Sequence, residues 1–431
     1  MKTFRILCTL IASADLEAEQ WDVIGAFLNS DIPDGDEIYV GFPEGFKKQG
    51  LVLRLHRGLY RLRQSPKLWF DTWAAILDKF GLIKADKEAC LWMNDWLILF
   101  FYVDDVISAF NNRDRPLYED LMTNIRKEIE IQELGELKWF LGICMVRHRP
   151  QRRLWISQAS YIEKIATRFS LTEGREYDTP LPAGVDFQHL IRSDQAPSQV
   201  VNEYQQMVGS IQYAATGTRP DVARAASQLA QFSQNPSAEH RSIAERVIQY
   251  LYYTRDLALQ YTSLLKQNMV HCYTDTSFAD DSVTRRSSHG YLTTLYGAAV
   301  DWKSAKQTSV STSSTEAKLR ALEYRAKSLM YTYRLFKSIQ FNPEQDLEVN
   351  YDNRQTIHLV ESENPTLVTA LRHVDVAHHW VREQVQQGIL QINWVSSAEQ
   401  SADGLTKALP GQKHRIFLQQ LGLVPLPKDQ D

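Results

Sequence analysis

The spacing of hydrophobic and polar residues divides the first part of the chain into helices and strands. Residues 4–18 carry apolar side chains at helical spacing, and WDVIGAFL then favours a short buried strand that leads into a turn. A second helix is predicted from Gln64 to Leu82, with Pro66 tolerated in its first turn. CLWMND and WLILFFYV have strand length, and the second continues through YVDDVISAF as a hairpin that turns at or near the aspartates. An amphipathic helix from Tyr118 to Glu130 and the strands LKWFLGICMVRH and LWISQ follow.

The pattern changes twice in the second part of the chain. From about Leu171 to Val200 the composition shifts to Pro, Asp, Gly and Ser, which indicates a linker or domain edge. Val201 to Thr254 is predicted to be mainly helical. After about Lys266 the strands MVHCYTD, HGYLTTLYG and AAVDWKSA precede a long helix, and LEVNYD and LQINWV then alternate with helices. Strands followed by alternating helices and strands indicate a mixed α/β domain.

Length and composition narrow the class of protein. A chain of 431 residues is too long for one ordinary core, so two or three domains are expected. The formal charge of −4 shows that the chain as a whole is not basic and so does not by itself indicate a nucleic-acid partner. A locally basic groove can still hold nucleic acid. The four cysteines are far apart and read as reduced thiols of an intracellular protein. The longest apolar run, Trp96 to Val103, is too short to span a bilayer.

Three aspartates at the ends of apolar strands form a first candidate site. Asp22 ends or closely follows one predicted strand, and Asp104 and Asp105 lie at the predicted hairpin tip. Carboxylates are costly there unless a cation compensates them, and nucleotidyl transfer uses such a cluster to hold two Mg²⁺ ions about 3.5–4 Å apart. Adjacent strand residues point to opposite faces, so Asp104 ranks above Asp105. Ordinary turn aspartates are the alternative.

A second set of carboxylates lies towards the C-terminus. Asp275 follows MVHCYT and Asp352 follows LEVNY, whereas Glu316 and Asp403 sit early on predicted helices. Strand ends beside helix starts can bring four such groups together, as hydrolysis with two Mg²⁺ ions requires. The alternatives are a capping box for Ser313-x-x-Glu316 and strand-end turns for the two aspartates.

The motifs around the first set resemble those of copia-type reverse transcriptases. QWDVIGAFLNSDI, LYRLRQSPKLW, YVDD and LGELKWFLGI appear in the family's order and at family-like spacing. The resemblance implies that Asp22 and Asp104 are metal ligands supported by Asp105. It further implies substrate-binding roles for the steric gate Phe27, for Tyr102 of the signature, for Gln64 near the incoming nucleotide, and for the primer grip Phe140, Leu141 and Gly142. From the residue types alone, Phe27, Phe140 and Leu141 could equally be core residues, and Gln64 a polar residue at a helix start.

The later blocks resemble the copia-type RNase H domain. YTDTSFADD, RRSSHGYL, DWKSAKQ, STSSTEAKLRAL, YDNRQTI, RHVDVAHHWVRE and EQSADGLTKAL follow one another, and YQQMVGSIQYAATGTRPDVARAASQLAQF resembles the family's connection segment. Asp275, Glu316, Asp352 and Asp403 fall where that family carries its catalytic and metal-binding carboxylates. Some positions depart from the family pattern: Lys318 stands where a glutamate is frequent, and Arg61 replaces a glycine.

These observations predict an α/β and α+β multidomain chain, with a right-hand polymerase palm followed by a ribonuclease H-like domain. The expected divisions are 1–170 for fingers and palm, 171–266 for thumb and connection, 267–410 for RNase H and 411–431 for a tail. The expected enzyme is a reverse transcriptase with RNase H activity. Its cofactor would be Mg²⁺, two ions at each site, with Mn²⁺ as a substitute.

The expected partners are an RNA template, a DNA primer, the RNA–DNA hybrid and deoxynucleoside triphosphates, with no membrane. The expected location is intracellular, in a cytoplasmic retrotransposon particle with access to the nucleus. Met1 lies so close before Asp22 that the palm is expected to be truncated at its start, with poor primer extension and an intact RNase H domain. The alternatives are a decayed, inactive fragment that at most binds nucleic acid, and a chain with nuclease activity alone.

Overall fold

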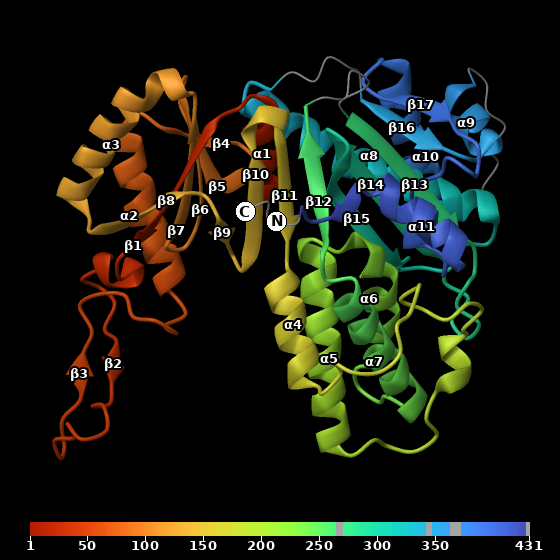
Figure 1. Cartoon of the computed structure of the whole chain (residues 1–431), viewed down its shortest axis with the longest axis horizontal. Helices are drawn as coiled ribbons and strands as arrows, with labels where there is room; N and C mark the ends of the chain where they lie inside the picture. The colour runs from red at the N-terminus through yellow and green to blue at the C-terminus, as the bar shows by residue number, and fades with distance from the viewer. Residues whose placement is uncertain (264–269, 342–346, 363–371, 428–431) are drawn as a thin grey trace. The chain divides into compact units, whose positions relative to one another are not determined.

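The computed structural model describes residues 1–263, 270–341, 347–362 and 372–427, with the side chains of residues 372–378 left out. It divides into two compact units (Figure 1). One consists of Asp15–Leu141, and the other of Met1–Ala14 together with Gly142–Asp431. We call them the palm unit and the C-terminal unit. No helix of the described chain combines the length and apolar character needed to cross a membrane.

The palm unit is built on one sheet with strands in the order β4-β5-β6-β7-β1-β8. The strands are β1 (Glu17–Val23), β4 (Ile83–Ala85), β5 (Glu88–Met93), β6 (Leu97–Tyr102), β7 (Asp105–Phe110) and β8 (Ile131–Glu136). Helices α2 (Ser65–Lys79) and α3 (Arg115–Glu128) share a core with the sheet that includes Trp21, Trp73, Val106 and Ile125. Trp21 therefore faces the helices, and its neighbour Asp22 lies on the opposite face.

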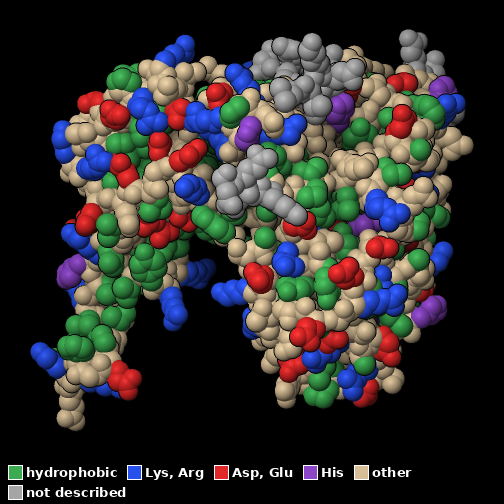
Figure 2. Space-filling model, viewed as in Figure 1, with side chains coloured by type: hydrophobic (Ala, Val, Ile, Leu, Met, Phe, Trp, Pro, Cys, Tyr) green, Lys and Arg blue, Asp and Glu red, His purple; other side chains and the backbone are tan. Residues whose placement is uncertain are grey.

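A long connection separates β1 from α2. It contains the short helix η1 (Ala26–Asn29) and the strands β2 (Tyr39–Val40) and β3 (Leu53–Arg54), which pair as a hairpin (Figure 1). Apolar side chains are exposed along this hairpin (Figure 2), among them Tyr39, Phe46, Leu51 and Val52. The short strand β9 (Trp139–Phe140) lies near the end of the unit.

The C-terminal unit begins with the buried helix α1 (Lys2–Ser13). Its Arg5 is 4% exposed, donates to the carbonyls of Val300, Thr216 and Gly217, and stacks over Trp302 at 3.8 Å. One sheet of this unit runs β18-β12-β11-β10, from β10 (Ile143–His148), β11 (Arg153–Ser157), β12 (Leu257–Thr262) and β18 (Leu423–Pro425). Four helices accompany it: α4 (Ala159–Arg168), α5 (Ser198–Gly217), α6 (Ala223–Ala230) and α7 (Ala238–Tyr253).

A buried ion pair holds the start of α6 against α7. Arg219 donates to both carboxylate oxygens of Asp221, at 2.9 and 2.7 Å, and neither side chain is exposed. The Tyr250 hydroxyl donates to the same carboxylate at 2.8 Å. Because both ions are removed from water, loss of one partner would leave a buried charge uncompensated.

A second sheet of the C-terminal unit is mixed, in the order β15-β14-β13-β16-β17. β13 (Val270–Ser277), β14 (Ser288–Leu295) and β15 (Ala298–Lys306) are antiparallel neighbours, whereas β16 (Glu348–Tyr351) and β17 (Gln391–Trp394) continue it in parallel. Helices α8 (Ser314–Ser338), α9 (Arg354–Glu361), α10 (Arg372–Gln386) and α11 (Gly411–Gln420) accompany these strands, with the short helix η6 (Asp403–Leu405). Side chains of β13, α8, β16 and β17 share a core, for example Cys272, Leu322, Val349 and Ile392.

The predicted fold class is confirmed: both units combine helices with sheets, and the C-terminal unit contains the expected mixed α/β sheet. The predicted helix at 4–18 ends earlier, at Ser13, because the chain turns at Asp15 with φ +52°. α4, β12 and β18 were not predicted. The domain divisions at residues 170, 266 and 410 stay predictions, since compactness alone does not locate a functional boundary. Most of the block RHVDVAHHWVRE lies outside the described side chains.

Candidate active sites

The three N-terminal aspartates converge where two neighbouring inner strands of the palm sheet, β1 and β7, meet the β6–β7 turn. Asp22 on β1 is the direct cross-strand partner of Asp105 on β7, so their side chains lie on the same face. Asp104 lies in the turn between β6 and β7, where its carbonyl accepts from the backbone N–H of Val23 at 3.0 Å. We call Asp22, Asp104 and Asp105 the palm carboxylates. The turn removes the objection that adjacent aspartates must face opposite ways.

A strained residue forms that turn. Tyr102 pairs with Asp105, which leaves Val103 and Asp104 as a two-residue loop. Val103 has φ +62°, a conformation that β-branched residues rarely adopt and that a type II′ hairpin needs at its first central residue. The indole N–H of Trp69 on α2 donates to the Val103 carbonyl at 2.7 Å, and the Trp69 ring stacks on Trp73 at 5.7 Å. The buried helix therefore tethers the turn that carries Asp104.

The palm carboxylates repel one another. Burial and the charges of Asp104 and Asp105 raise the pKa of Asp22 above its ordinary value. Burial and Asp104 likewise raise the pKa of Asp105. A site in which each negative charge disfavours the next would be stabilised by a bound cation.

The predicted substrate-binding residues of the palm unit differ in their exposure to solvent and in their contacts. Phe27 on η1 is 9% exposed and contacts the ring of Tyr60 edge-on at 4.9 Å. Tyr102 is 55% exposed at the end of β6. Gln64 stands at the N-cap position of α2 without a side-chain capping hydrogen bond, and its buried amide nitrogen finds no hydrogen-bond partner in the described chain. An unsatisfied buried donor is costly, so this amide is a reasonable candidate to bind a ligand.

Sequence reasoning missed Tyr60. Its exposed ring packs on Phe27, and burial together with Asp104 and Asp22 raises the pKa of its hydroxyl. Tyr60 therefore lies beside the palm carboxylates, although it belongs to the segment LYRLRQSPKLW. The motif alone could have suggested it, but only the fold shows which of its residues reaches the site.

The predicted primer grip lies where the two compact units join along the chain. Phe140 is 1% exposed and packs on Phe100 with ring centroids 5.7 Å apart. Leu141 and Gly142 follow with φ of +49° and +71°. Phe140 is thus a core residue of the palm unit, and a role for the three in primer binding stays a prediction.

Three of the four C-terminal carboxylates also come together. Tyr273 on β13 pairs with Asn350 on the parallel β16, which places Asp275 and Asp352 at equivalent positions two residues further on. Asp403 begins η6, and the residues that follow Asp403 reach Asp275: the Thr406 hydroxyl donates to its carboxylate, and the Lys407 amine lies 3.4 Å from it. We call Asp275, Asp352 and Asp403 the RNase H carboxylates.

Mutual repulsion marks this group as well. Burial and Asp275 raise the pKa of Asp352, although Lys318 and Lys407 oppose the shift. Burial raises the pKa of Asp403, against a hydrogen bond from Lys407, with Asp275 and Asp352 adding to the rise. One oxygen of Asp352, Oδ1, is buried without a hydrogen-bond partner within the described ranges. An orphaned carboxylate oxygen beside two further carboxylates fits a cation site.

Glu316 is occupied by other partners. It lies in the first turn of α8, where its carboxylate accepts from the N–H and hydroxyl of Thr312, both at 2.8 Å, and from two nitrogens of Arg320 at 3.0 and 2.8 Å. Burial would raise the pKa of Glu316, but these donors hold it below its ordinary value. Ser313 accepts from the Glu316 N–H at 3.1 Å, so half of the predicted capping box forms. A part in metal binding would require Glu316 to exchange Arg320 for the ion.

Neither group of carboxylates already has the geometry of a metal site. Among the described residues, no three His, Cys, Asp or Glu side chains converge closely enough to hold a single ion. The repulsion within both groups and the free Asp352 oxygen nevertheless show which side chains a cation would stabilise. The residue types fit divalent ions with oxygen ligands.

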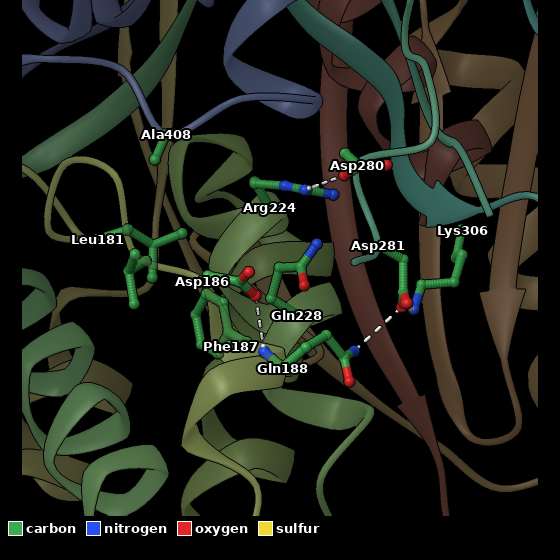
Figure 3. Close-up of a pocket in the computed structure, with 11 residues that line it drawn as sticks. Leu181, Asp186, Phe187, Gln188, Arg224, Gln228, Asp280, Asp281, Lys306 and Ala408 are labelled. Atoms are coloured by element: carbon green, nitrogen blue, oxygen red, sulfur yellow. Dashed lines mark hydrogen bonds and ion pairs between the residues drawn. The ribbon is translucent and has the colours of Figure 1, made fainter. Parts of the chain in front are cut away.

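A polar cavity of about 210 Å³ lies elsewhere in the C-terminal unit (Figure 3). Its two basic side chains, Arg224 and Lys306, are already paired with carboxylates. Arg224 donates to Asp280 at 2.8 Å, and Asp281 accepts from Lys306 and from the Gln188 amide (Figure 3). These pairs explain the cavity as a polar junction between α6 and the mixed sheet.

Comparison with known proteins identifies the family. Residues 1–183 match the family described as "Reverse transcriptase (RNA-dependent DNA polymerase)". The chain is 33% identical over 439 residues to the Retrovirus-related Pol polyprotein from transposon TNT 1-94 of Nicotiana tabacum, covering 98% of this chain and 32% of that protein. It is 28% identical to the polyprotein from transposon RE1 of Arabidopsis thaliana, covering 99% and 29%. The chain thus spans about a third of the length of these relatives.

A shorter relative is covered almost completely. The putative transposon Ty5-1 protein of Saccharomyces cerevisiae is 30% identical over 292 residues, covering 66% of this chain and 92% of that protein. Among solved structures, the foamy viral protease-reverse transcriptase in complex with dsDNA gives a TM-score of 0.47 at 13% identity, covering 88% of this chain and 68% of that one. The chain covers 92% of the Ty5-1 relative at 30% identity and matches the two plant polyproteins over nearly its whole length, so this protein belongs to the copia-type retrotransposon Pol family of reverse transcriptases.

Proposed function

We propose that this chain carries out RNA-directed DNA synthesis at the palm carboxylates and hydrolysis of the RNA strand of the hybrid at the RNase H carboxylates. The observation that supports this most directly is the presence of two separate carboxylate groups, one in each compact unit. Families of both enzyme types use divalent metal ions, and we propose Mg²⁺, two ions at each site, with Mn²⁺ able to substitute. Bound ions would supply the positive charge that activates the attacking oxygen and stabilises the leaving one.

The residues around the palm carboxylates suggest how a nucleotide would bind. Asp22 and Asp104 would hold the ions, with Asp105 as the supporting carboxylate. Phe27 and Tyr60, which pack edge-on, would face the sugar and exclude a 2′-hydroxyl by bulk. The unsatisfied amide of Gln64 would donate to the nucleotide.

In the C-terminal unit, Asp275, Asp352 and Asp403 would hold the ions, and Glu316 would join them after releasing Arg320. The RNA–DNA hybrid is the proposed substrate. An intracellular particle with access to the nucleus is the proposed location.

If the two sites are independent, a single substitution should abolish one activity and leave the other intact. We expect Asp104→Asn to abolish primer extension on poly(rA)–oligo(dT) while sparing hybrid cleavage, and Asp275→Asn to do the reverse. Each substitution removes a ligand at one site only, which costs several kcal/mol of transition-state stabilisation there. Circular dichroism would establish that both variants fold.

The outcomes are distinct. Loss of both activities from either change, with the fold intact, would refute the two-site proposal. Cleavage without extension by the unchanged chain would identify a nuclease alone. No activity of either kind would identify a non-catalytic member of the family.

A further inference from the structure

The amine of Lys407 occupies the space between two of the RNase H carboxylates. It lies 2.8 Å from Asp403 Oδ1 and 3.4 Å from Asp275 Oδ2. Asp403 is four residues earlier in the chain, whereas Asp275 comes from β13. The positive charge of Lys407 therefore links β13 to η6.

Lys407 is more exposed to solvent than the two aspartates that it contacts. The Asp275 side chain is 2% exposed and accepts from the Thr406 hydroxyl. The Asp403 side chain is 21% exposed at the start of η6. The Lys407 side chain is 45% exposed. A lysine on a flexible four-carbon stem can return its ammonium to water at little desolvation cost, whereas Asp275 is buried and bound by Thr406.

The carboxylates need a positive charge at this place. Asp275 and Asp403 both lie within 3.4 Å of this one ammonium, and a buried carboxylate such as Asp275 is costly without a compensating cation. The ammonium thus supplies the positive charge that a divalent ion held by these carboxylates would supply.

We propose that Lys407 is a resident counter-ion of the RNase H site, which holds the carboxylates together in the absence of metal and competes with the divalent ion for them. This inference rests on the proposed RNase H function. The proposal gives Lys407 a part in metal binding: its ammonium leaves the carboxylates when the ion binds. The competition follows because Lys407 already uses Asp275 Oδ2 and Asp403 Oδ1, the oxygens that an ion held by these two aspartates would need.

The test measures metal binding directly. Mn²⁺ binding to the full chain is followed by titration calorimetry in an Asp104→Asn background, which removes a ligand of the other site. Lys407→Met keeps the length of the side chain and removes its charge, and Lys407→Arg keeps the charge. Lys327→Met is a matched control, since Lys327 also pairs with a carboxylate in i,i+4 geometry, with Glu323 on α8.

We expect Lys407→Met to bind Mn²⁺ about tenfold more tightly, which corresponds to about 1.4 kcal/mol. In EDTA the same variant should unfold at a temperature several degrees lower, and Mn²⁺ should restore it, because the bare carboxylates then repel one another. Lys407→Arg and Lys327→Met should resemble the parent in both measurements.

Each other outcome overturns the proposal in a distinguishable way. Unchanged or weaker Mn²⁺ affinity of Lys407→Met, with the parent binding normally, would show that Lys407 does not compete with the ion. Weaker binding of the RNA–DNA hybrid as the sole change would make Lys407 a substrate contact. No Mn²⁺ binding to parent or variant would refute the metal site itself, and with it the competition.

Discussion

The turn at Val103 offers a test of whether backbone strain positions Asp104. Val103 has φ +62°, and a non-glycine residue held in such a conformation costs about 1–3 kcal/mol. Val103→Gly removes that cost. The substitution also loses about 1 kcal/mol through the greater freedom of unfolded glycine, and about 1 kcal/mol of partial apolar burial. The net change in stability should therefore lie within about 1 kcal/mol of zero.

A matched substitution in the same hairpin should behave differently. Val106 on β7 is fully buried at an ordinary strand conformation. Val106→Gly loses about 1.5–3 kcal/mol of burial together with about 1 kcal/mol of backbone entropy, with no strain to relieve. It should destabilise the hairpin by about 3 kcal/mol.

Hydrogen exchange of the peptide covering β6 and β7 measures local opening in each variant, which avoids the assumption that the two units unfold together. Primer extension measures the consequence for Asp104. We expect Val103→Gly to keep its exchange protection and to lose extension at least tenfold, because the turn no longer fixes the carboxylate. Destabilisation equal to that of Val106→Gly would refute the strain, and unchanged extension would refute its role in positioning.

Two further predictions follow from other contacts. Phe27→Ala should raise ribonucleotide incorporation more than it lowers the rate with deoxynucleotides, because it opens space instead of deleting an attraction; unchanged selectivity in single-nucleotide incorporation would make Phe27 a core residue only. Asp221→Asn should cost about 3–5 kcal/mol at pH 7 by leaving Arg219 buried and uncompensated. Burial raises the pKa of Asp221 but Arg219 outweighs it, so the pKa is lowered. The pair therefore stabilises the fold fully above the ordinary carboxyl pKa, near 4, and this stability is lost as pH falls below it. Urea unfolding at pH 7 and pH 3.5 should show a smaller difference for the variant than for the parent.

The long elements could be predicted because their patterns are local. α2 and α3 show an apolar stripe with proline in the first turn, and the β6–β7 hairpin follows from two apolar runs around adjacent aspartates. β18 could not be predicted in this way. It has three residues and exists because it pairs with β12, whose sequence lies far from it in the chain. Pairing partners of that kind leave no periodic signal.

In the candidate sites, too, features with a local sequence pattern could be predicted and features set by distant contacts could not. Asp352 directly follows β16, as the apolar run before it predicts, whereas Asp22 and Asp275 are still paired within β1 and β13, so the prediction that Asp275 follows its strand is wrong. The environment of Glu316 could not be predicted, because the same i,i+4 spacing to Arg320 is compatible with an ordinary surface pair. Tyr60 was missed since the loop that carries it has no periodic pattern, and only the fold brings its ring onto Phe27.

In both sites neighbouring carboxylates repel one another, but different features of the structure hold them in place. In the palm unit, the influences that raise the pKa of Asp22 are burial and two neighbouring carboxylates, and the geometry is maintained by the backbone: a strained turn whose carbonyl is bound by Trp69. In the C-terminal unit the backbone is regular at Asp275, and a side-chain cation, Lys407, lies between the carboxylates. Strain stored in a turn persists whether or not an ion is bound, because the surrounding structure, including the hydrogen bond from Trp69, maintains it. A lysine holds the carboxylates only until a stronger cation arrives. The palm carboxylates should therefore keep their arrangement through binding, whereas the RNase H carboxylates exchange one counter-ion for another.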